Sequence, residues 1–126
     1  MALETYQPST IPNARWEAIC DFTVSLGQQY RDLHPEIAYN RYMPVLARLV
    51  DVVCNRDGYE QDIEVVLDAE MIEMMIRDEL DDLSVHSRGV YKTTLRRLGE
   101  ALNPSWMGRR RSTRNTPVRP HSRRTP

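Results

Sequence analysis

The chain has 126 residues, 40% of them hydrophobic and 28% charged, and a formal net charge of −1. This length allows one domain with a hydrophobic core and excludes most large enzymes, and the composition is typical of a globular protein rather than a disordered or membrane one. The near-neutral total conceals a division: residues 1–103 carry a net −8, whereas residues 104–126 hold seven arginines and no acid, which favours a polyanionic partner such as nucleic acid.

The amino-terminal arm, residues 1–12, has neither the basic start nor the apolar run of a secretory signal. No stretch of the sequence reaches the 18 or so apolar residues of a membrane span, so we expect a cytoplasmic protein with no membrane partner. Cys20 and Cys54 fall in helix-like apolar patterns without metal-ligand spacing. We predict that both are small buried hydrophobic residues, in preference to metal ligands or a disulfide.

The first helix is predicted over residues 13–31, because apolar side chains recur there at three- and four-residue steps. Asn13 or Thr10 can cap its start. The residues that share its buried face are Trp16, Ile19, Thr23, Leu26 and Tyr30.

The second helix is predicted to begin at His34 and Pro35 and to reach about Arg56. Pro44 lies inside this stretch, where it either kinks the helix or divides it, and we favour a kink. The turn residues 55–58 end the helix. Its apolar stripe is Tyr42, Leu46, Leu49 and Val53.

Residues 62–67 are predicted to form an ordered loop, because one isolated strand would have no partner. A third helix over 69–80 follows, capped by Asp68, with Ile72, Ile76 and Leu80 on one face. Met71 and Met75 beside them are interpreted as core residues rather than as a binding groove. The acidic run Asp78, Glu79, Asp81 and Asp82 lacks cation-loop spacing and is interpreted as a solvated face.

The fourth helix begins at Ser84 or Ser87 and ends at residues 103–104. Tyr91, Leu95, Leu98 and Leu102 form its apolar seam. We therefore predict an all-α bundle of four or five helices over 13–103, followed by a flexible tail or linker over 104–126. Its expected core is Trp16, Ile19, Tyr42, Leu46, Leu49, Val53, Ile72, Ile76, Leu95 and Leu98.

Basic residues mark two candidate DNA-binding segments. Arg88, Lys92 and Arg96 follow one another at four-residue steps on the fourth helix, with Arg97 alongside. Such a stripe can contact phosphate, or it can be a solvated face paired with nearby acids. The second segment is the tail, residues 104–126. It cannot form a core but can lie along a phosphate backbone, where it supplies affinity rather than sequence readout. Its arginines are Arg109, Arg110, Arg111, Arg114, Arg119, Arg123 and Arg124.

Enzymatic motifs are not evident in the sequence, which has no glycine-rich phosphate loop, no nucleophile elbow and no His-Glu-x-x-His. The histidines, His34, His86 and His121, are spread over a turn, a helix start and the tail. We therefore expect no enzyme activity, no cofactor, no metal and no small-molecule substrate.

Three stretches carry a family resemblance: DIEVV at 62–66, DAEMIE at 68–73 and SVHSRGVYKTTLRRLGEALNP at 84–104. With them, residues 13–124 resemble the amino-terminal half of actinobacterial and phage tyrosine recombinases, the site-specific integrases. The resemblance implies a SAM-like core-binding domain of four or five helices that binds double-stranded DNA, followed by a basic linker. The abundance of arginine over lysine is compatible with such a source, which would place the protein in a bacterial cytosol or a phage-infected host.

The same resemblance implies that the chain is not catalytic alone, because the recombinase tyrosine nucleophile and its partner residues belong to a further domain. Residues 121–124 match one catalytic box, His-x-x-Arg, but lie in the Pro- and Arg-rich tail, and we interpret them as linker. Two hypotheses follow. One is a DNA-binding module, such as a mobile-element accessory factor or a truncated integrase. The other is a small helical interaction or regulatory protein with an incidental basic tail.

Overall fold

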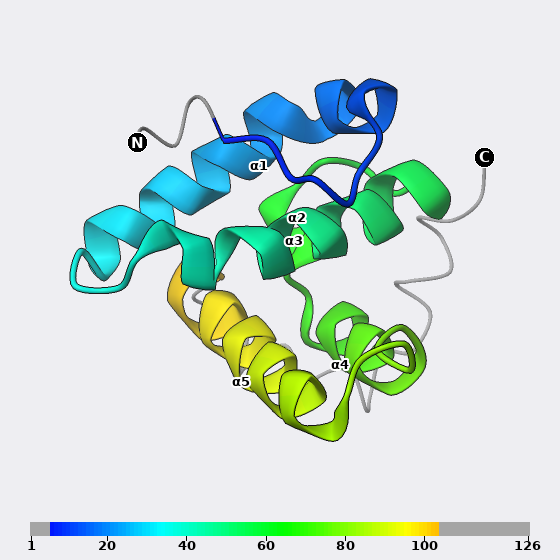
Figure 1. Cartoon of the computed structure of the whole chain (residues 1–126). Helices are drawn as coiled ribbons and strands as arrows, with labels where there is room; N and C mark the ends of the chain where they lie inside the picture. Colours follow the sequence, from blue (N-terminus) through cyan, green and yellow to red (C-terminus); the bar gives the residue numbers. More distant parts are fainter. Residues whose placement is uncertain (1–5, 104–126) are drawn as a thin grey trace, which may run out of the picture.

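The computed structural model describes residues 6–103, which contain five α-helices, two other helical segments and no strand (Figure 1). The predicted all-α fold is thus confirmed. Residues 104–126, which include the predicted tail, lie outside the described residues. The elements are α1 (Asn13–Leu33), the 3₁₀ turn η2 (Tyr39–Arg41), α2 (Met43–Val50), the π-helical segment η3 (Asp51–Arg56), α3 (Ile63–Val66), α4 (Ala69–Asp78) and α5 (Val85–Leu102).

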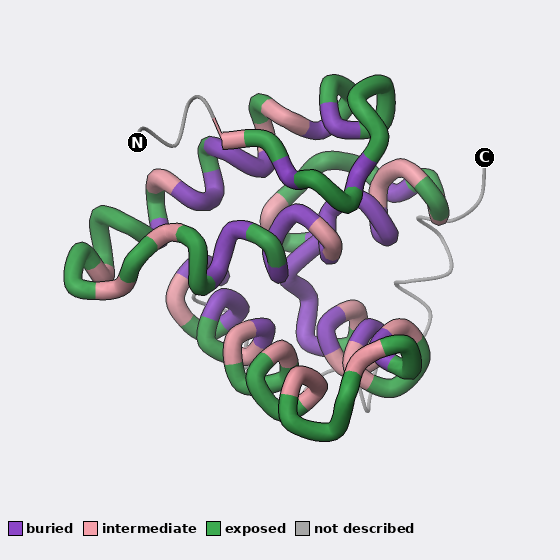
Figure 2. Tube along the Cα trace, in the orientation of Figure 1, coloured by how far each residue is buried: buried purple, intermediate pink, exposed green. Residues whose placement is uncertain are grey.

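Helix α2 crosses the middle of the molecule, with α1 on one side and α5 on the other (Figure 1). Its sequence is almost entirely apolar, so it can be buried on most of its circumference. Figure 2 shows the buried segments gathered around it, with the link between α3 and α4 also buried and the segment between α1 and α2 mostly exposed. Its fully buried residues are Met43, Leu46, Ala47, Leu49 and Val50.

Helix α1 buries the predicted face and ends two residues later than expected, where the His34 N–H donates to the Tyr30 carbonyl at 2.8 Å. The predicted caps are wrong. The cap position is Pro12, which has no side chain to accept a hydrogen bond, and Asn13 is already the first helical residue. The Asn13 side chain instead accepts a hydrogen bond from the Gln7 amide.

The described part of the amino-terminal arm, residues 6–12, packs against the bundle. Ile11 is buried in the core. The Tyr6 ring meets the rings of Trp16 and Tyr39 edge-on, with 5.9 Å between centroids in each pair. The arm thus covers the first turn of α1 with apolar surface.

The second helix starts later than predicted, and the kink at Pro44 is wrong. Residues 34–38 form no helix, η2 makes a single tight turn, and α2 then begins at Met43. Pro44 occupies the first turn of α2, where a missing N–H leaves no hydrogen bond unmade. The proline therefore starts the helix instead of bending it.

The end of this helix widens into the π-helical segment η3. The N–H of Asp57, the residue that follows η3, donates to the Val52 carbonyl five residues earlier, at 3.0 Å. Asp51, at its start, is buried and bound by the Arg15 guanidinium of α1. The Asn55 amide joins the two, donating to Asp51 at 2.8 Å and to the Arg15 carbonyl at 2.9 Å. The predicted stop is confirmed at Gly58, whose φ of 78° suits glycine.

The loop predicted at 62–67 is instead the short helix α3. The Asp62 carboxylate accepts from the Glu64 N–H at 2.8 Å, and this cap, with burial of Val65 and Val66, outweighs the extended preference of β-branched residues. Asp68 caps α4 as predicted, accepting from the Glu70 N–H at 3.1 Å.

Helix α4 buries Ile72 and Met75, whereas Ile76, predicted for the core, is only partly buried at its edge. Met75 is buried instead of Ile76, because the buried face of α4 is the one that packs against α5. The other nine predicted core residues are buried. Leu80 is also buried, although α4 ends two residues before it.

Helix α5 begins with the predicted cap Ser84, whose hydroxyl accepts from the Ser87 N–H at 3.2 Å. Leu95, Leu98 and Leu102 are buried, and Tyr91 is partly buried. Asn103 ends the helix as predicted. Its buried amide donates to the Leu67 carbonyl at 3.0 Å, which ties the end of α5 to the link between α3 and α4.

Both cysteines are free thiols and are partly, not fully, buried. The absence of a disulfide agrees with the prediction, but the expected complete burial is wrong. The Cys54 thiol donates to the Glu60 carbonyl at 3.6 Å, and burial raises its pKa to about 12. Cys54 is therefore a protonated packing residue at neutral pH.

Leu95→Ala tests the central packing of α5. Leu95 is fully buried, so we expect a loss of about 2–5 kcal/mol in the free energy of unfolding, measured by urea denaturation. Val90→Ala on the exposed side of the same helix is the control, with a change within about 0.5 kcal/mol. A loss below about 1 kcal/mol for Leu95→Ala would contradict this packing.

Candidate nucleic-acid interface

Half of the ten basic residues in the described part of the chain are held by carboxylates. The pairs with the largest sequence separation join different elements and so help to fix the bundle. Arg56 pairs with both Asp57 and Glu79, and the other pairs are Arg15 with Asp51, Arg48 with Asp82, Arg77 with Asp78, and Arg96 with Glu73. The remaining five have no ion pair within residues 6–103: Arg31, Arg41, Arg88, Lys92 and Arg97.

The predicted basic stripe on α5 is only partly free. Glu73 of α4 binds Arg96 with two hydrogen bonds, at 3.0 Å to Nε and 2.9 Å to Nη2. This carboxylate raises the pKa of Arg96 and neutralises its charge locally. Arg88 and Lys92, the other members of the stripe, have no such partner in the described chain, and Lys92 is exposed.

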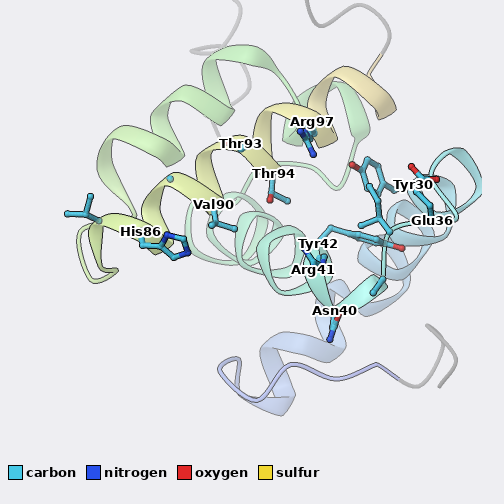
Figure 3. A pocket seen from close by; sticks show the side chains of 14 residues that line it. Tyr30, Glu36, Asn40, Arg41, Tyr42, His86, Val90, Thr93, Thr94 and Arg97 are labelled. Carbon is cyan, nitrogen blue, oxygen red and sulfur yellow. The ribbon is translucent and has the colours of Figure 1, made fainter.

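Arg97 does not share the surface of Arg96. One residue further along a helix turns the side chain by about 100°, so Arg97 leaves α5 on the opposite flank from α4. It lies at the edge of an open groove, opposite the segment that joins α1 to α2 (Figure 3). The four predicted α5 residues thus divide into a paired one, Arg96, a groove residue, Arg97, and two surface cations.

This groove has a volume of about 1070 Å³. One wall is the exposed face of α5, with Val90, Thr94 and Arg97, and the other is the 36–42 segment, with Arg41 (Figure 3). Arg41 and Arg97 are both among the unpaired cations, so two guanidinium groups without carboxylate partners border one hollow.

The inner end of the groove is aromatic. The rings of Tyr30 and Tyr42 pack edge-on at 4.7 Å between centroids. Burial raises the pKa of both phenols; the positive charge of Arg97 opposes the shift at Tyr30, and that of Arg31 opposes it at Tyr42. The Tyr42 hydroxyl is buried and has no hydrogen-bond partner in the described chain.

The acidic run at the end of α4 is mostly exposed, as predicted for a solvated face, but three of its four carboxylates also bind arginines. Arg48 binds both the Asp82 carboxylate and the Glu79 carbonyl at 2.7 Å, and its guanidinium lies 5.8 Å from the Tyr91 ring centroid. The Arg48 guanidinium lowers the pKa of Asp82 by hydrogen bonding to it. Within residues 6–103 no group of three or more His, Cys, Asp and Glu side chains could hold a metal ion.

The histidines lie apart from one another. His34 follows α1, with its Nδ1 at 3.4 Å from a Glu36 carboxylate oxygen, and His86 lies in the first turn of α5, at the groove. His121 and the seven predicted DNA-binding arginines from Arg109 to Arg124 lie outside the described residues. Among the helices that are described, none is long and apolar enough to cross a membrane.

Sequence reasoning identified Arg97 but missed the groove and its other residues. Arg41, Tyr30 and Tyr42 come from a turn and two helices, and no motif links them to α5. No protein-family model, curated protein or solved structure matches this chain.

Tyr42→Phe tests the unpartnered hydroxyl. It removes the hydroxyl while keeping the ring packing, so the free energy of unfolding should stay unchanged or rise by up to about 1 kcal/mol in thermal or urea unfolding. Tyr42→Ala, which also loses the ring, should cost about 3–5 kcal/mol. A destabilisation above about 1 kcal/mol by Tyr42→Phe would show that the hydroxyl is hydrogen-bonded in solution.

Proposed function

We propose that this chain is a non-catalytic, cytoplasmic double-stranded DNA-binding module of the kind found before the catalytic domain of tyrosine recombinases. One observation carries the proposal. Helix α5 holds three cations without ion pairs in the described chain, Arg88, Lys92 and Arg97, and the sequence continues from this helix into seven arginines without an acid. Three of the five cations without ion pairs in residues 6–103 thus lie on α5, directly before the arginine-rich segment.

Binding to DNA requires this clustering of cations on α5 and the arginine-rich segment, because residues 1–103 as a whole are acidic. Residues 1–103 carry a net −8, and a uniformly distributed negative charge would repel a polyanion. Ion pairs such as Arg15 with Asp51 remove cations from the rest of the surface. Most of the remaining attraction for DNA then comes from α5 and the arginine-rich segment, which orients the protein on the duplex.

The two parts have different roles in this proposal. Arg88 and Lys92 project from a packed helix, so their contacts cost little conformational entropy and can fix the register on DNA. The seven arginines after α5 supply affinity through phosphate contacts and counterion release. In this role the protein occupies recombination sites as an accessory factor or a competitor, without cutting DNA.

The alternative is a protein-interaction module. Val85 and Val90 on α5 are 78% and 48% exposed, and exposed apolar side chains on one helix favour contact with a protein partner. If the intact protein binds no duplex even at low salt, this alternative replaces the DNA proposal.

Replacing the seven arginines from Arg109 to Arg124 with glutamine should weaken binding to all duplexes. It should also flatten the dependence of log K on log salt, because each phosphate contact contributes about 0.9 to that slope. Fluorescence anisotropy on two unrelated duplexes at several salt concentrations measures both effects. An unchanged slope would contradict the role of this segment.

The double variant Arg88→Gln with Lys92→Gln removes the two stripe residues that have no ion pair within residues 6–103. It should reduce the magnitude of the slope of log K against log salt by about 2, and it should narrow any difference in affinity between the two duplexes. The double variant Arg31→Gln with Arg77→Gln is the matched control, because it removes two charges from exposed positions on α1 and α4. Equal losses in the control and in the Arg88 and Lys92 variant would mean that net charge alone, not the α5 surface, determines binding.

A further inference from the structure

The groove between α5 and the 36–42 segment has a chemistry that DNA binding by the α5 stripe does not use. It lies on the flank of α5 that carries Arg97, whereas Arg96 turns toward α4. Arg41 reaches the same hollow from η2 (Figure 3). In a body with a large excess of acids, these two arginines nevertheless have no carboxylate partner within residues 6–103.

The other lining groups suit an organic molecule rather than a bare ion. Val90 and Ile37 line the hollow with aliphatic side chains, and Thr94 adds a hydroxyl beside Arg97. The rings of Tyr30 and Tyr42 lie beneath this lining and are almost fully buried. The volume of about 1070 Å³ is slightly above the range of roughly 300–1,000 Å³ that is usual for small-ligand sites.

The charges of the groove determine the sign of its occupant. Two guanidinium groups favour a phosphate or carboxylate, which they bind through charge-assisted and often bidentate hydrogen bonds. The carboxylate of Glu36, also in the lining, lies near His34 and could accept a hydrogen bond from a hydroxyl or amine of the ligand. The arginine-rich segment of this chain has the wrong sign for Arg41 and Arg97, so it is not the occupant.

We propose that this groove binds a small organic anion, in which a phosphate or carboxylate held by Arg41 and Arg97 is attached to an apolar body that packs against Val90 and Ile37. The proposal goes beyond the proposed function and does not depend on it, because the ligand is a small molecule and binds in the absence of DNA.

Titration of the full-length protein with phenyl phosphate, inorganic phosphate and phenol tests the proposal. Phenyl phosphate offers both the anion and the ring, so we expect it to bind at least about tenfold more tightly than inorganic phosphate or phenol. Calorimetry and amide NMR shifts measure the binding of each probe. The largest shifts should fall on Tyr30, Thr94 and Arg97. No shift in the groove up to about 10 mM phenyl phosphate would overturn the proposal, as would equal affinity for phenyl phosphate and inorganic phosphate.

Arg97→Gln and Arg41→Gln, made separately, should each weaken phenyl phosphate binding by roughly ten- to hundredfold. Arg77→Gln removes the same charge from α4, outside the groove, and should leave the affinity unchanged. A similar loss in all three variants would reduce the effect to general surface attraction and overturn the proposal. Arg41 and Arg97 lie on different elements, so the second variant remains informative if the first one does not fold.

The outcome is separable from that of the DNA proposal. Failure of duplex binding in the anisotropy experiment would leave the phenyl phosphate titration unaffected, because neither Arg88 nor Lys92 lines the groove. Conversely, if the groove binds no phenyl phosphate, the DNA proposal is unaffected, because the salt dependence of DNA binding tests the arginine-rich segment and not the groove.

Discussion

Burial of α2 on nearly all sides is the constraint on which the rest of the structure depends. A helix with Met43, Leu46, Leu49 and Val50 fully buried must be covered from more than one direction, and α1 and α5 are the elements long enough to do so. Packing of α5 on α1, α2 and α4 then leaves its remaining face to solvent. The free cations and the groove both result from the position that α2 imposes on α5.

Ion pairing adds a second level of organisation. Exposed salt bridges contribute little stability individually, but in this protein they determine which cations remain available. The Arg15 and Asp51 pair, with Asn55 between them, secures α1 to the π-helical segment. Glu73 does the same for α4 and α5 through Arg96. The arginines used for structure are thereby separated from those that face solvent and the groove.

The two flanks of α5 therefore support two different kinds of recognition. On one flank, Arg88 and Lys92 present isolated charges on a convex surface, which suits a phosphate backbone. On the other, Arg97 and Arg41 border a concave site lined by Val90 and Ile37, which suits a small organic anion.

The all-α fold, α4 with its Asp68 cap, α5 with its Ser84 cap, and most of the core could be predicted from the sequence, because they rest on local periodicity and capping. Nine core positions such as Leu95 and Tyr42 follow directly from apolar spacing. The errors arose where local signals conflict. Pro44 is compatible with a kink or a helix start, and residues 62–67 combine β-branched side chains with a helix cap.

Only the tertiary structure decided which cations are free and where a groove forms. Arg88, Lys92 and Arg96 are equivalent in sequence, but the carboxylate of Glu73, which lies on another helix and 23 residues away from Arg96, binds Arg96. Arg41 and Arg97 are likewise brought to one hollow by the packing of α5 beside the turn before α2. Periodicity specifies which face of a helix is buried, whereas the partner of an exposed charge depends on contacts between elements that no local pattern encodes.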